Sequence, residues 1–204
     1  MAGDVELSVP IGVVRPRVAL SEELAAVGVA MIRDVRSPVV VDVGAGAGTV
    51  AVLIGRARSD ASVHATDISS RAVAAARTNV KRLRLANVDV HLGDLLGPLP
   101  SQLRGRVDAI VTNLPADPPS TVRPGGSRDP NAALVGHGSD GMGLLRVLAS
   151  QSRAFLRPGG RLVVTLLGWQ WDVLRDELSS IGYVPLPVHP STATAYRYAV
   201  AERR

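Results

Sequence analysis

Asp42-Val43-Gly44-Ala45-Gly46-Ala47-Gly48-Thr49 is the most informative stretch of this 204-residue chain. It follows a short apolar run over 38–43 that is typical of a buried parallel strand, and it precedes a helical pattern over 49–58. Glycines permit positive φ angles and let a ligand approach the backbone closely. The first turn of the following helix offers N–H groups that have no partner within the helix. The stretch therefore predicts a strand–turn–helix unit that holds a ligand at its turn.

Strand and helix patterns alternate along the rest of the chain. Strands are expected over the ranges 62–66, 88–92, 107–112 and 161–167. Helices are expected over 69–84 with Ser69 as the N-cap, on an apolar face of Leu144, Val147, Leu148 and Phe155, and on one of Trp171, Leu174, Leu178 and Ile181 closed by Gly182. Alternation from Thr194 to Val200 predicts a last, antiparallel strand. This order predicts a doubly wound α/β fold, with a mostly parallel seven-stranded sheet and a final antiparallel hairpin.

The chain is expected to divide into a helical segment over 1–35, which covers the cofactor site, and a larger domain over 36–204. In the first segment Ser21 is the expected N-cap of a helix, with Glu22 and Glu23 in its first turn and an apolar face of Leu24, Val27 and Met31. The stretch 115–141 is rich in Pro, Gly, Ser and Asp, and a loop of that length is usually functional or mobile.

Charge and composition exclude several classes of protein. The 23 basic and 18 acidic residues give a net charge of +5, but no dense basic run occurs. Arg77, Lys81, Arg82 and Arg84 fit the solvated face of a helix, so a nucleic-acid partner is kept only as an alternative. The chain has no cysteine, which excludes disulfides and thiolate catalysis, and its histidines lack metal-ligand spacing, so no metal is expected. Without an N-terminal signal or an apolar run of about 20 residues, a soluble, cytoplasmic protein with no membrane partner is expected.

The residues around the glycines discriminate between ligands. A phosphate-binding P-loop requires Gly-Lys-Ser/Thr, whereas Thr49 and Val50 follow Gly48 here. The glycines are spaced G-x-G-x-G and not G-x-G-x-x-G, the dinucleotide pattern. Asp42 would repel a pyrophosphate, but it would attract the sulfonium and ammonium groups of S-adenosylmethionine (SAM).

Two further aspartates follow later strands. Asp67 comes 25 residues after Asp42 and can accept both hydroxyls of a ribose. Asp94 can reach the amino group of an adenine. Either aspartate alone would be explained as a turn or a helix cap. All three at successive strand ends favour a nucleoside cofactor with a cationic tail.

These motifs resemble those of class I SAM-dependent methyltransferases, in order and spacing, over about residues 36–204. The resemblance implies SAM as cofactor and S-adenosylhomocysteine as product. The residues that it implies for cofactor binding are Asp42, Gly44, Ala45, Gly46, Gly48, Asp67, Ile68, Asp94, Leu95 and Asn113.

A narrower resemblance is to the HemK-type family, which methylates a glutamine amide in release factors. Thr112-Asn113-Leu114-Pro115-Ala116 stands where amino-methylating members have Asn-Pro-Pro-Tyr, and 129–134, 137–141 and 156–160 are also similar to that family. The likeness of Arg15-Pro16-Arg17 and 21–24 to an upstream segment is looser. Ala116 cannot supply the family's aromatic ring, which packs on the acceptor amide. Only about 35 residues precede the first core strand, so the family's N-terminal domain is not expected.

The resemblance implies that Asn113, Leu114 and Pro115 are the catalytic segment. The Asn113 side-chain oxygen and the Leu114 carbonyl would accept hydrogen bonds from an acceptor N–H and aim its nitrogen at the methyl group; alternatively, Asn113 only caps the turn. Asn113, Ala116, His137 and Trp169 are the expected acceptor contacts, although His137 also fits a solvated loop residue. Arg15 and Arg17 could meet a carboxylate of the cofactor or substrate.

Three functions remain open on these grounds. The first is N-methylation of an amide, amine or guanidine-type nitrogen in a small molecule or peptide. The second is methylation of a protein, as for release factors, or of RNA. The third is a non-catalytic SAM-binding partner subunit, which the missing tyrosine permits and Asn113 disfavours. The oligomeric state is not predicted.

Overall fold

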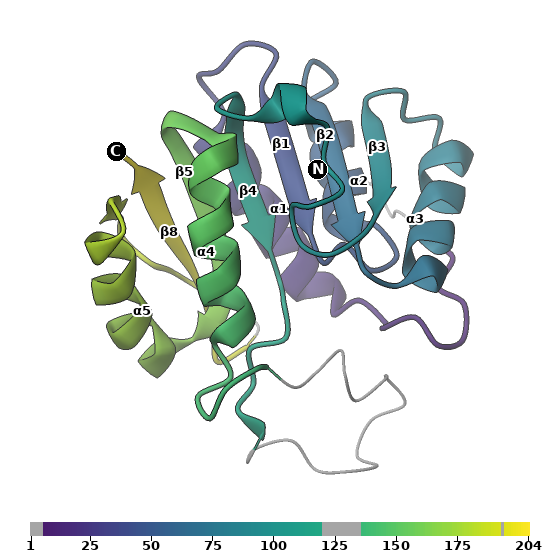
Figure 1. The fold of residues 1–204 in the computed structure, drawn as a ribbon. Helices are drawn as coiled ribbons and strands as arrows, with labels where there is room; N and C mark the ends of the chain where they lie inside the picture. The colour runs from purple at the N-terminus through teal and green to yellow at the C-terminus, as the bar shows by residue number, and fades with distance from the viewer. Residues whose placement is uncertain (1–5, 120–135, 193) are drawn as a thin grey trace.

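The computed structural model describes residues 6–119, 136–192 and 194–204. One sheet crosses the molecule, and helices cover both of its faces (Figure 1). Its order is β3-β2-β1-β4-β5-β8-β6, and its bounds are β1 Val39–Val43, β2 Ser62–Asp67, β3 Val88–Leu92, β4 Val107–Thr112, β5 Leu156–Leu167, β6 Tyr183–Pro185 and β8 Tyr196–Arg203. The strands β1 to β5 are parallel, and β8 is antiparallel to β5 and β6. This confirms the expected doubly wound sheet, to which the two-residue strand β7 (His189–Pro190) adds a short pairing with β8.

The described helices are α1 (Val18–Met31), α2 (Thr49–Ala57), α3 (Ser70–Arg82), α4 (Gly143–Phe155) and α5 (Gly168–Ser180), with a 3₁₀ turn, η1, over Ser101–Leu103. Ser69 caps α3 as expected, since its hydroxyl accepts a hydrogen bond from the Ala72 N–H at 3.3 Å. Within the described ranges, no helix is both long and apolar enough to cross a membrane.

The expected start of the first helix is wrong. Helix α1 begins at Val18, after Arg17, so Ser21 lies inside it and is buried. Glu23 is not in a first turn; its carboxylate accepts hydrogen bonds from the Tyr198 hydroxyl at 2.8 Å and from the Thr192 N–H at 3.0 Å. The acid that suggested a helix start therefore attaches α1 to β8.

The expected apolar face of α4 is also wrong in part. The buried residues are Leu145, Leu148, Ala149, Ser152 and Phe155, at the i, i+3, i+4 spacing of a helix face. Val147 is exposed, and Leu144 turns toward the cavity described below. The expected faces of α5 and β8 are confirmed: Leu174 and Leu178 are buried, Trp171 and Ile181 pack beside them, and Tyr198 and Val200 point to the opposite core from Ala199.

Pro158-Gly159-Gly160 lies within β5 and not before it. Strand β5 begins at Leu156, which pairs with Val107, and its register to β4 shifts before Arg161 pairs with Ala109. Gly159 has a φ of 74°, and a Cβ on Gly160 would come within 2.9 Å of the Val107 carbonyl oxygen. The Pro-Gly-Gly sequence, which was expected to form a turn, instead forms a bulge in a continuous strand.

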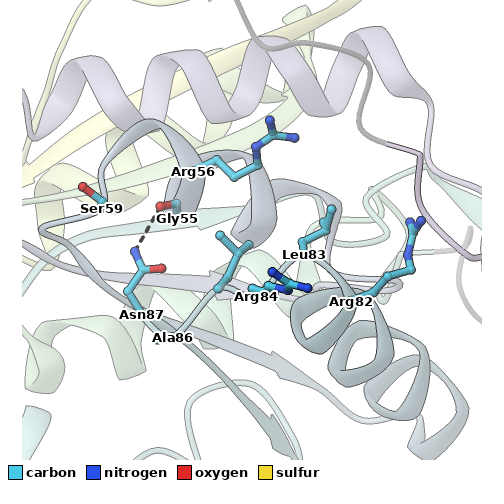
Figure 2. A pocket seen from close by; sticks show the side chains of 9 residues that line it. Gly55, Arg56, Ser59, Arg82, Leu83, Arg84, Ala86 and Asn87 are labelled. Atoms are coloured by element: carbon cyan, nitrogen blue, oxygen red, sulfur yellow. Dashed lines mark hydrogen bonds between the residues drawn. The ribbon is translucent and has the colours of Figure 1, made fainter.

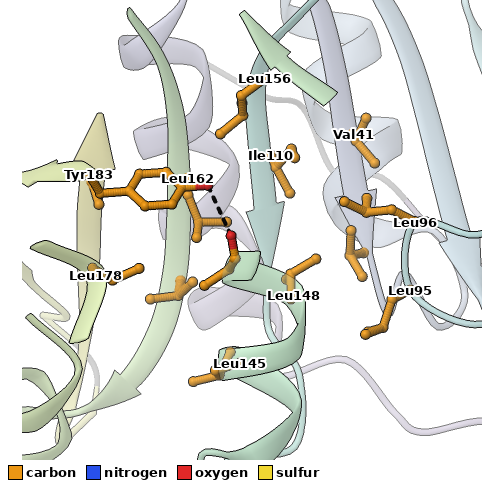
Figure 3. Close-up of a cluster of buried hydrophobic side chains, with 14 of the residues drawn as sticks. Val41, Leu95, Leu96, Ile110, Leu145, Leu148, Leu156, Leu162, Leu178 and Tyr183 are labelled. Carbon is orange, nitrogen blue, oxygen red and sulfur yellow. Dashed lines mark hydrogen bonds between the residues drawn. The ribbon is translucent and has the colours of Figure 1, made fainter. Parts of the chain in front are cut away.

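Two cores lie on opposite faces of the sheet. Helices α4 and α5 cover one, in which Tyr183 and Ser152 share a hydrogen bond of 2.6 Å amid leucines (Figure 3). Helices α1 and α2 cover the other, which is richer in valine and alanine. The valine-rich strands between the two cores are buried on both faces, as parallel strands require.

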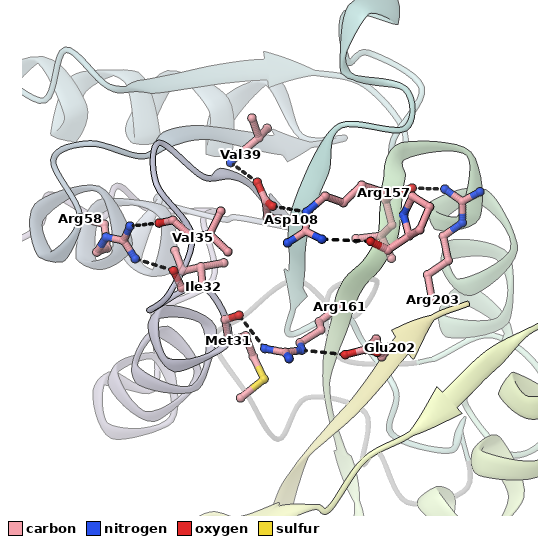
Figure 4. A network of polar contacts seen from close by, with 12 residues as sticks. Met31, Ile32, Val35, Val39, Arg58, Asp108, Arg157, Arg161, Glu202 and Arg203 are labelled. Atoms are coloured by element: carbon pink, nitrogen blue, oxygen red, sulfur yellow. Dashed lines mark hydrogen bonds and ion pairs between the residues drawn. The ribbon is translucent and has the colours of Figure 1, made fainter.

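Arginines tie the elements together at the amino ends of β1, β4 and β5 (Figure 4). The Asp108 carboxylate accepts a hydrogen bond from the Val39 N–H at 2.8 Å and forms an ion pair with Arg157. Arg58 donates to the Ile32 and Val35 carbonyls, at 2.6 Å each. Arg161 donates to the Met31 carbonyl at 2.8 Å and pairs with Glu202. This end of the sheet is fixed by structural contacts, and the opposite end carries the cavity.

Candidate cofactor and acceptor site

A cavity of about 630 Å³ lies at the carboxyl ends of the parallel strands, which point to the bottom of Figure 1. Residues that follow β1, β2, β3 and β4 line it. The strand order reverses between β1 and β4, and ligands of doubly wound sheets bind at such a reversal. The volume suits a nucleoside cofactor together with a small acceptor group.

The glycine turn forms one wall of this cavity. The N–H groups of Gly44 and Ala45 both donate to the Thr66 carbonyl, at 2.9 and 3.0 Å, which fixes the turn against β2. Gly46 has a φ of 57°, and a Cβ placed there would meet no atom within 4 Å, so its backbone faces open space.

Gly48 has a different role from the one expected. It does not line the cavity; it precedes α2 with a φ of 84°, and a Cβ there would lie 3.1 Å from the Ala76 Cβ. This glycine lets α2 start and pack against α3, so the sequence pattern placed a packing residue among the expected cofactor contacts.

Asp42 lies at the base of the cavity and is only 2% exposed. Its carboxylate accepts a hydrogen bond from the Ala51 N–H at 3.0 Å, in the first turn of α2. Burial raises the pKa of Asp42 to about 7; the Ala51 hydrogen bond opposes this, and the negative charge of Asp67 adds to it. A cation in the cavity would relieve this burden and favour the ionised carboxylate.

Asp67 joins the glycine turn to the start of α3. One carboxylate oxygen accepts the Gly46 N–H and the other the Ser69 N–H, both at 2.8 Å. Ile68, 73% exposed, stands between them on the cavity rim. An apolar rim residue beside a carboxylate suits a base stacked above a ribose.

Asp94 and Leu95 line the cavity after β3, as expected. Asp94 is exposed, and its carbonyl accepts the Gly97 N–H at 2.9 Å, while Leu95 is buried with a φ of 44°. This tight turn keeps a carboxylate at the mouth and an apolar side chain inside.

Two buried hydroxyls in the cavity wall have no hydrogen-bond partner within the described structure. They belong to Thr66 at the end of β2 and Thr165 near the end of β5. A buried polar group without a partner is costly, so these hydroxyls fit a site whose ligand supplies the missing partners. With the open backbone at Gly46 and the buried carboxylate of Asp42, the Thr66 hydroxyl fits SAM, a nucleoside with two positive charges.

Asn113, Leu114 and Pro115 run along the cavity from the end of β4. The Thr112 hydroxyl donates to the Val43 carbonyl at 2.8 Å and fixes this strand end beside the glycine turn. A Cβ on Gly44 would come within 2.9 Å of the Leu114 Cδ2, so the two segments touch. The structure therefore brings the expected catalytic segment and the expected cofactor turn into contact.

Ala116 lines the cavity, but Trp169 does not. Trp169 is 48% exposed at the start of α5, and the residue that points inward there is Gln170. The Gln170 amide donates to the Ala116 carbonyl at 2.6 Å and to the Asp140 carbonyl at 3.1 Å. The helix begins at Gly168, and its first turn directs Gln170 to the buried side, so Trp169 faces solvent.

His137 lines the cavity from the exposed side, after the gap in the described residues. Asp140 follows it and pairs with Arg146, which also pairs with Glu177, at 2.7 and 2.8 Å. The described parts of the expected 115–141 loop are thus fixed against α4 and α5. The segment 129–134, which is similar to the HemK-type family, lies outside the described residues.

Several cavity residues were not expected from the sequence: Asp117, Leu144, Thr165 and Tyr196. Asp117 directly follows the motif at 113–116, which is the one signal that could have indicated it. Thr165 and Tyr196 stand in β5 and β8, where alternation indicates only a strand. Arg15 and Arg17, which the sequence left undecided, line the cavity from the segment before α1.

A second, more open cleft lies near the opposite end of the strands from the cavity (Figure 2). Arg56 of α2, Arg82 of α3 and Arg84 surround it, and Asn87 closes its floor by donating to the Gly55 carbonyl at 3.0 Å. No carboxylate is among its described lining residues. It is basic, and it is separated from the cavity by the length of the strands.

Comparison with known proteins places these features in a family context. Residues 26–123 match the model of the methyltransferase small domain. The chain is 35% identical over 173 residues to the release factor glutamine methyltransferase of Gloeobacter violaceus, covering 82% of this chain and 58% of that one. It is 31% identical to the Streptomyces coelicolor enzyme of the same name, over 97% of this chain and 71% of the relative. The chain thus spans about three fifths of the length of the first relatives it matches.

Solved structures share the fold. The ribosomal protein L11 methylase of Lactobacillus delbrueckii subsp. bulgaricus is 20% identical, with a TM-score of 0.68 over 98% of this chain and 85% of that one. The magnesium protoporphyrin IX methyltransferase of Synechocystis, solved with bound SAM, is 18% identical, with a TM-score of 0.62 over 92% and 81%.

Proposed function

This chain belongs to the family of SAM-dependent methyltransferases that includes the release factor glutamine methyltransferases, and we propose that it transfers a methyl group from SAM to a side-chain amide nitrogen of a peptide or protein. The observation that carries this proposal is the contact between Gly44 and Leu114, which supports a site where the glycine turn holds the cofactor and the segment 113–116 holds the acceptor. The name of the relatives supports a glutamine side chain as the acceptor.

The residues divide the work of holding the cofactor. Asp42 faces the positive groups of SAM from beneath, where its buried charge is least screened. Asp67 and Asp94 accept hydrogen bonds from the ribose and adenine, and Ile68 and Leu95 contact the base. Gly46 leaves its backbone accessible. The segment before α1 covers the cofactor site from outside, and its Arg15 and Arg17 line the cavity.

The acceptor is positioned by Asn113 and Leu114. Their side-chain and backbone carbonyl oxygens accept hydrogen bonds from the amide N–H groups, which turns the nitrogen toward the methyl group. SAM, when held by these residues, would supply an electrophilic methyl group; a nitrogen oriented by Asn113 and Leu114 would take that group in exchange for its proton, which passes to solvent, and S-adenosylhomocysteine would be left with the electron pair of the broken carbon–sulfur bond. Positioning is the main contribution of the protein to such a displacement.

Incubation with methyl-labelled SAM and a cell extract tests the proposal. After separation into small-molecule, protein and RNA fractions, the label is expected in protein. Mass spectrometry of protease-digested peptides, without acid hydrolysis, should locate it on glutamine. Label confined to small molecules or RNA would replace this acceptor class by one of the alternatives. No transfer to any fraction, with SAM still bound, would point to the non-catalytic subunit.

Asn113→Ala is the informative variant for the acceptor motif. Loss of one hydrogen bond that orients the nitrogen is expected to lower kcat/KM on the order of a hundredfold. The Kd for SAM, measured by calorimetry, should change little, because Asp42 and the glycine turn remain. An unaltered kcat/KM with SAM bound would leave Asn113 as a turn cap only.

A further inference from the structure

We propose that Thr165, Tyr196 and Asp117 form the subsite that holds the acceptor amide and sets its specificity for an uncharged side chain. This inference rests on the proposed function and adds three positioning residues that the acceptor motif does not contain. All three line the cavity, and they come from β5, β8 and the segment after β4.

Thr165 lies beside the expected catalytic asparagine. The last registered pair of β4 and β5 is Thr112 with Val164, so Asn113 and Thr165 come next at the ends of adjacent strands. Thr165 is 1% exposed, and its hydroxyl has no partner in the described structure. A ligand group bound at Asn113 would therefore lie close to the buried Thr165 hydroxyl and could serve as its hydrogen-bond partner.

Tyr196 and Asp117 close the same corner. The Tyr196 hydroxyl donates to both carboxylate oxygens of Asp117, at 2.9 and 3.2 Å. Tyr196 lies on the same face of β8 as Tyr198, which pairs with Thr165. Tyr196 is thus the next residue on that face toward the cavity. Burial raises the pKa of Tyr196, so the phenol keeps its proton and donates it in a hydrogen bond to the Asp117 carboxylate. The Asp117 oxygens keep lone pairs that can accept an N–H from a ligand.

Charge in this corner is balanced. The guanidinium carbon of Arg17 lies over the Tyr196 ring, 5.6 Å from its centroid, and both Arg17 and Asp117 hydrogen-bond to Tyr196. A carboxylate or an ammonium side chain would therefore have to compete with Tyr196 for either charge. A primary amide has no charge to repel, and its N–H groups can use the oxygens of Asn113, Thr165 and Asp117.

The test compares single-atom and ring-conserving variants with purified release factor as acceptor. Thr165→Val keeps the shape and removes the hydroxyl, and Tyr196→Phe keeps the ring and removes the hydroxyl that bonds to Asp117 and Arg17. Each should raise KM for the acceptor roughly threefold to tenfold, the effect of one lost hydrogen bond, while the Kd for SAM stays within about twofold. A peptide with glutamate in place of the glutamine carries no nitrogen to methylate, and it should inhibit Asp117→Asn more strongly than wild type.

Tyr198→Phe is the matched control for Tyr196→Phe. Tyr198 lies on the same face of β8, but its hydroxyl bonds to the Leu20 carbonyl and Glu23 and does not line the cavity. Its KM for the acceptor should equal that of wild type. Unchanged acceptor KM in Thr165→Val and Tyr196→Phe, or a parallel rise in the Kd for SAM, overturns the inference while wild-type transfer leaves the proposed function intact. No transfer by wild type removes both.

Discussion

Asp42 is the single residue whose chemistry depends most on its surroundings. Its pKa of about 7 in the absence of a ligand means that a large fraction of the chains carry a proton there near neutral pH. The positive groups of SAM favour the ionised form, so binding of SAM should release that proton.

We therefore expect SAM to bind more tightly as the pH rises through about 7. Between pH 6 and pH 8 the Kd should fall roughly tenfold, because about a tenth of the carboxyl groups are ionised one unit below the pKa. Calorimetry at the two pH values measures this change. Asp42→Asn should bind SAM weakly at both pH values, and a wild-type Kd that does not vary would contradict the role given to Asp42.

The same residue affects stability with the opposite sign. The folded-state pKa of Asp42 lies above its unfolded value of 3.8, so the unfolded state binds fewer protons between these values. The contribution of Asp42 to the free energy of unfolding therefore decreases as the pH rises from about 4 to about 7. The buried carboxylate that favours binding of the cofactor near neutral pH therefore lowers the free energy of unfolding of the chain when no cofactor is bound.

At the scale of elements, Gln170 joins α5 and β5 to the segments after β4 and before α4. It is fully buried in the first turn of α5, accepts the Leu167 N–H at 2.8 Å from the end of β5, and donates to the carbonyls of Ala116 and Asp140. A Cβ on Gly141 would lie only 2.2 Å from the Ala116 carbonyl oxygen, so these backbones are in direct contact. The positions of Asn113 and Leu114 depend on this packing.

Gln170→Leu should therefore impair both stability and catalysis. The loss leaves the Ala116 carbonyl without its donor and costs about 1–3 kcal/mol in the free energy of unfolding. It should also raise the KM for the acceptor, because the motif after β4 loosens. Urea denaturation and steady-state kinetics measure the two effects.

Gln151→Leu is the control for this variant, since Gln151 is exposed on α4 and makes only a 3.5 Å contact with the Leu96 N–H. It should match wild type in both assays. A Gln170→Leu chain with wild-type KM would mean that the acceptor motif holds its position without this helix.

The sequence predicted elements better than their connections. Buried valine runs and alternation indicated every strand at the site, because burial on both faces of a parallel sheet restricts the residue types. The start of α1 was misplaced, because Ser21 and Glu22 mimic a cap while tertiary contacts with β8 determine the boundary. Thr165 and Tyr196 could not be predicted as site residues, because the pairing of β4 with β5 brings Thr165 beside Asn113 and the pairing of β5 with β8 brings Tyr196 to the same end of the sheet.

At the scale of the whole molecule, two groups of arginines line hollows near opposite ends of the strands. Arg15 and Arg17 stand at the cavity, and Arg56, Arg82 and Arg84 surround the second cleft. Only the first group is close to the site of methyl transfer. The charge of +5 thus gives no direct indication of the acceptor.

Replacement of Arg56, Arg82 and Arg84 by serine should reduce retention on heparin, since three exposed positive charges are removed. The kcat/KM for release factor and the Kd for SAM should be unchanged. A loss of methyl transfer in the triple variant would show that the acceptor extends around the molecule to the basic cleft. Replacement of Arg33, Arg36 and Arg175 by serine, which removes three exposed charges elsewhere, controls for net charge.

The position of Ala116 also bears on how acceptor choice in this chain can change over evolutionary time. Its contacts with Gly141 and Gln170 are made by its backbone carbonyl, and the residue itself lines the cavity. A larger side chain at this position would therefore take up space that is now open to the acceptor. Exchange of this one residue is a short route to an altered acceptor range, since the backbone contacts that hold the segment do not depend on the side chain.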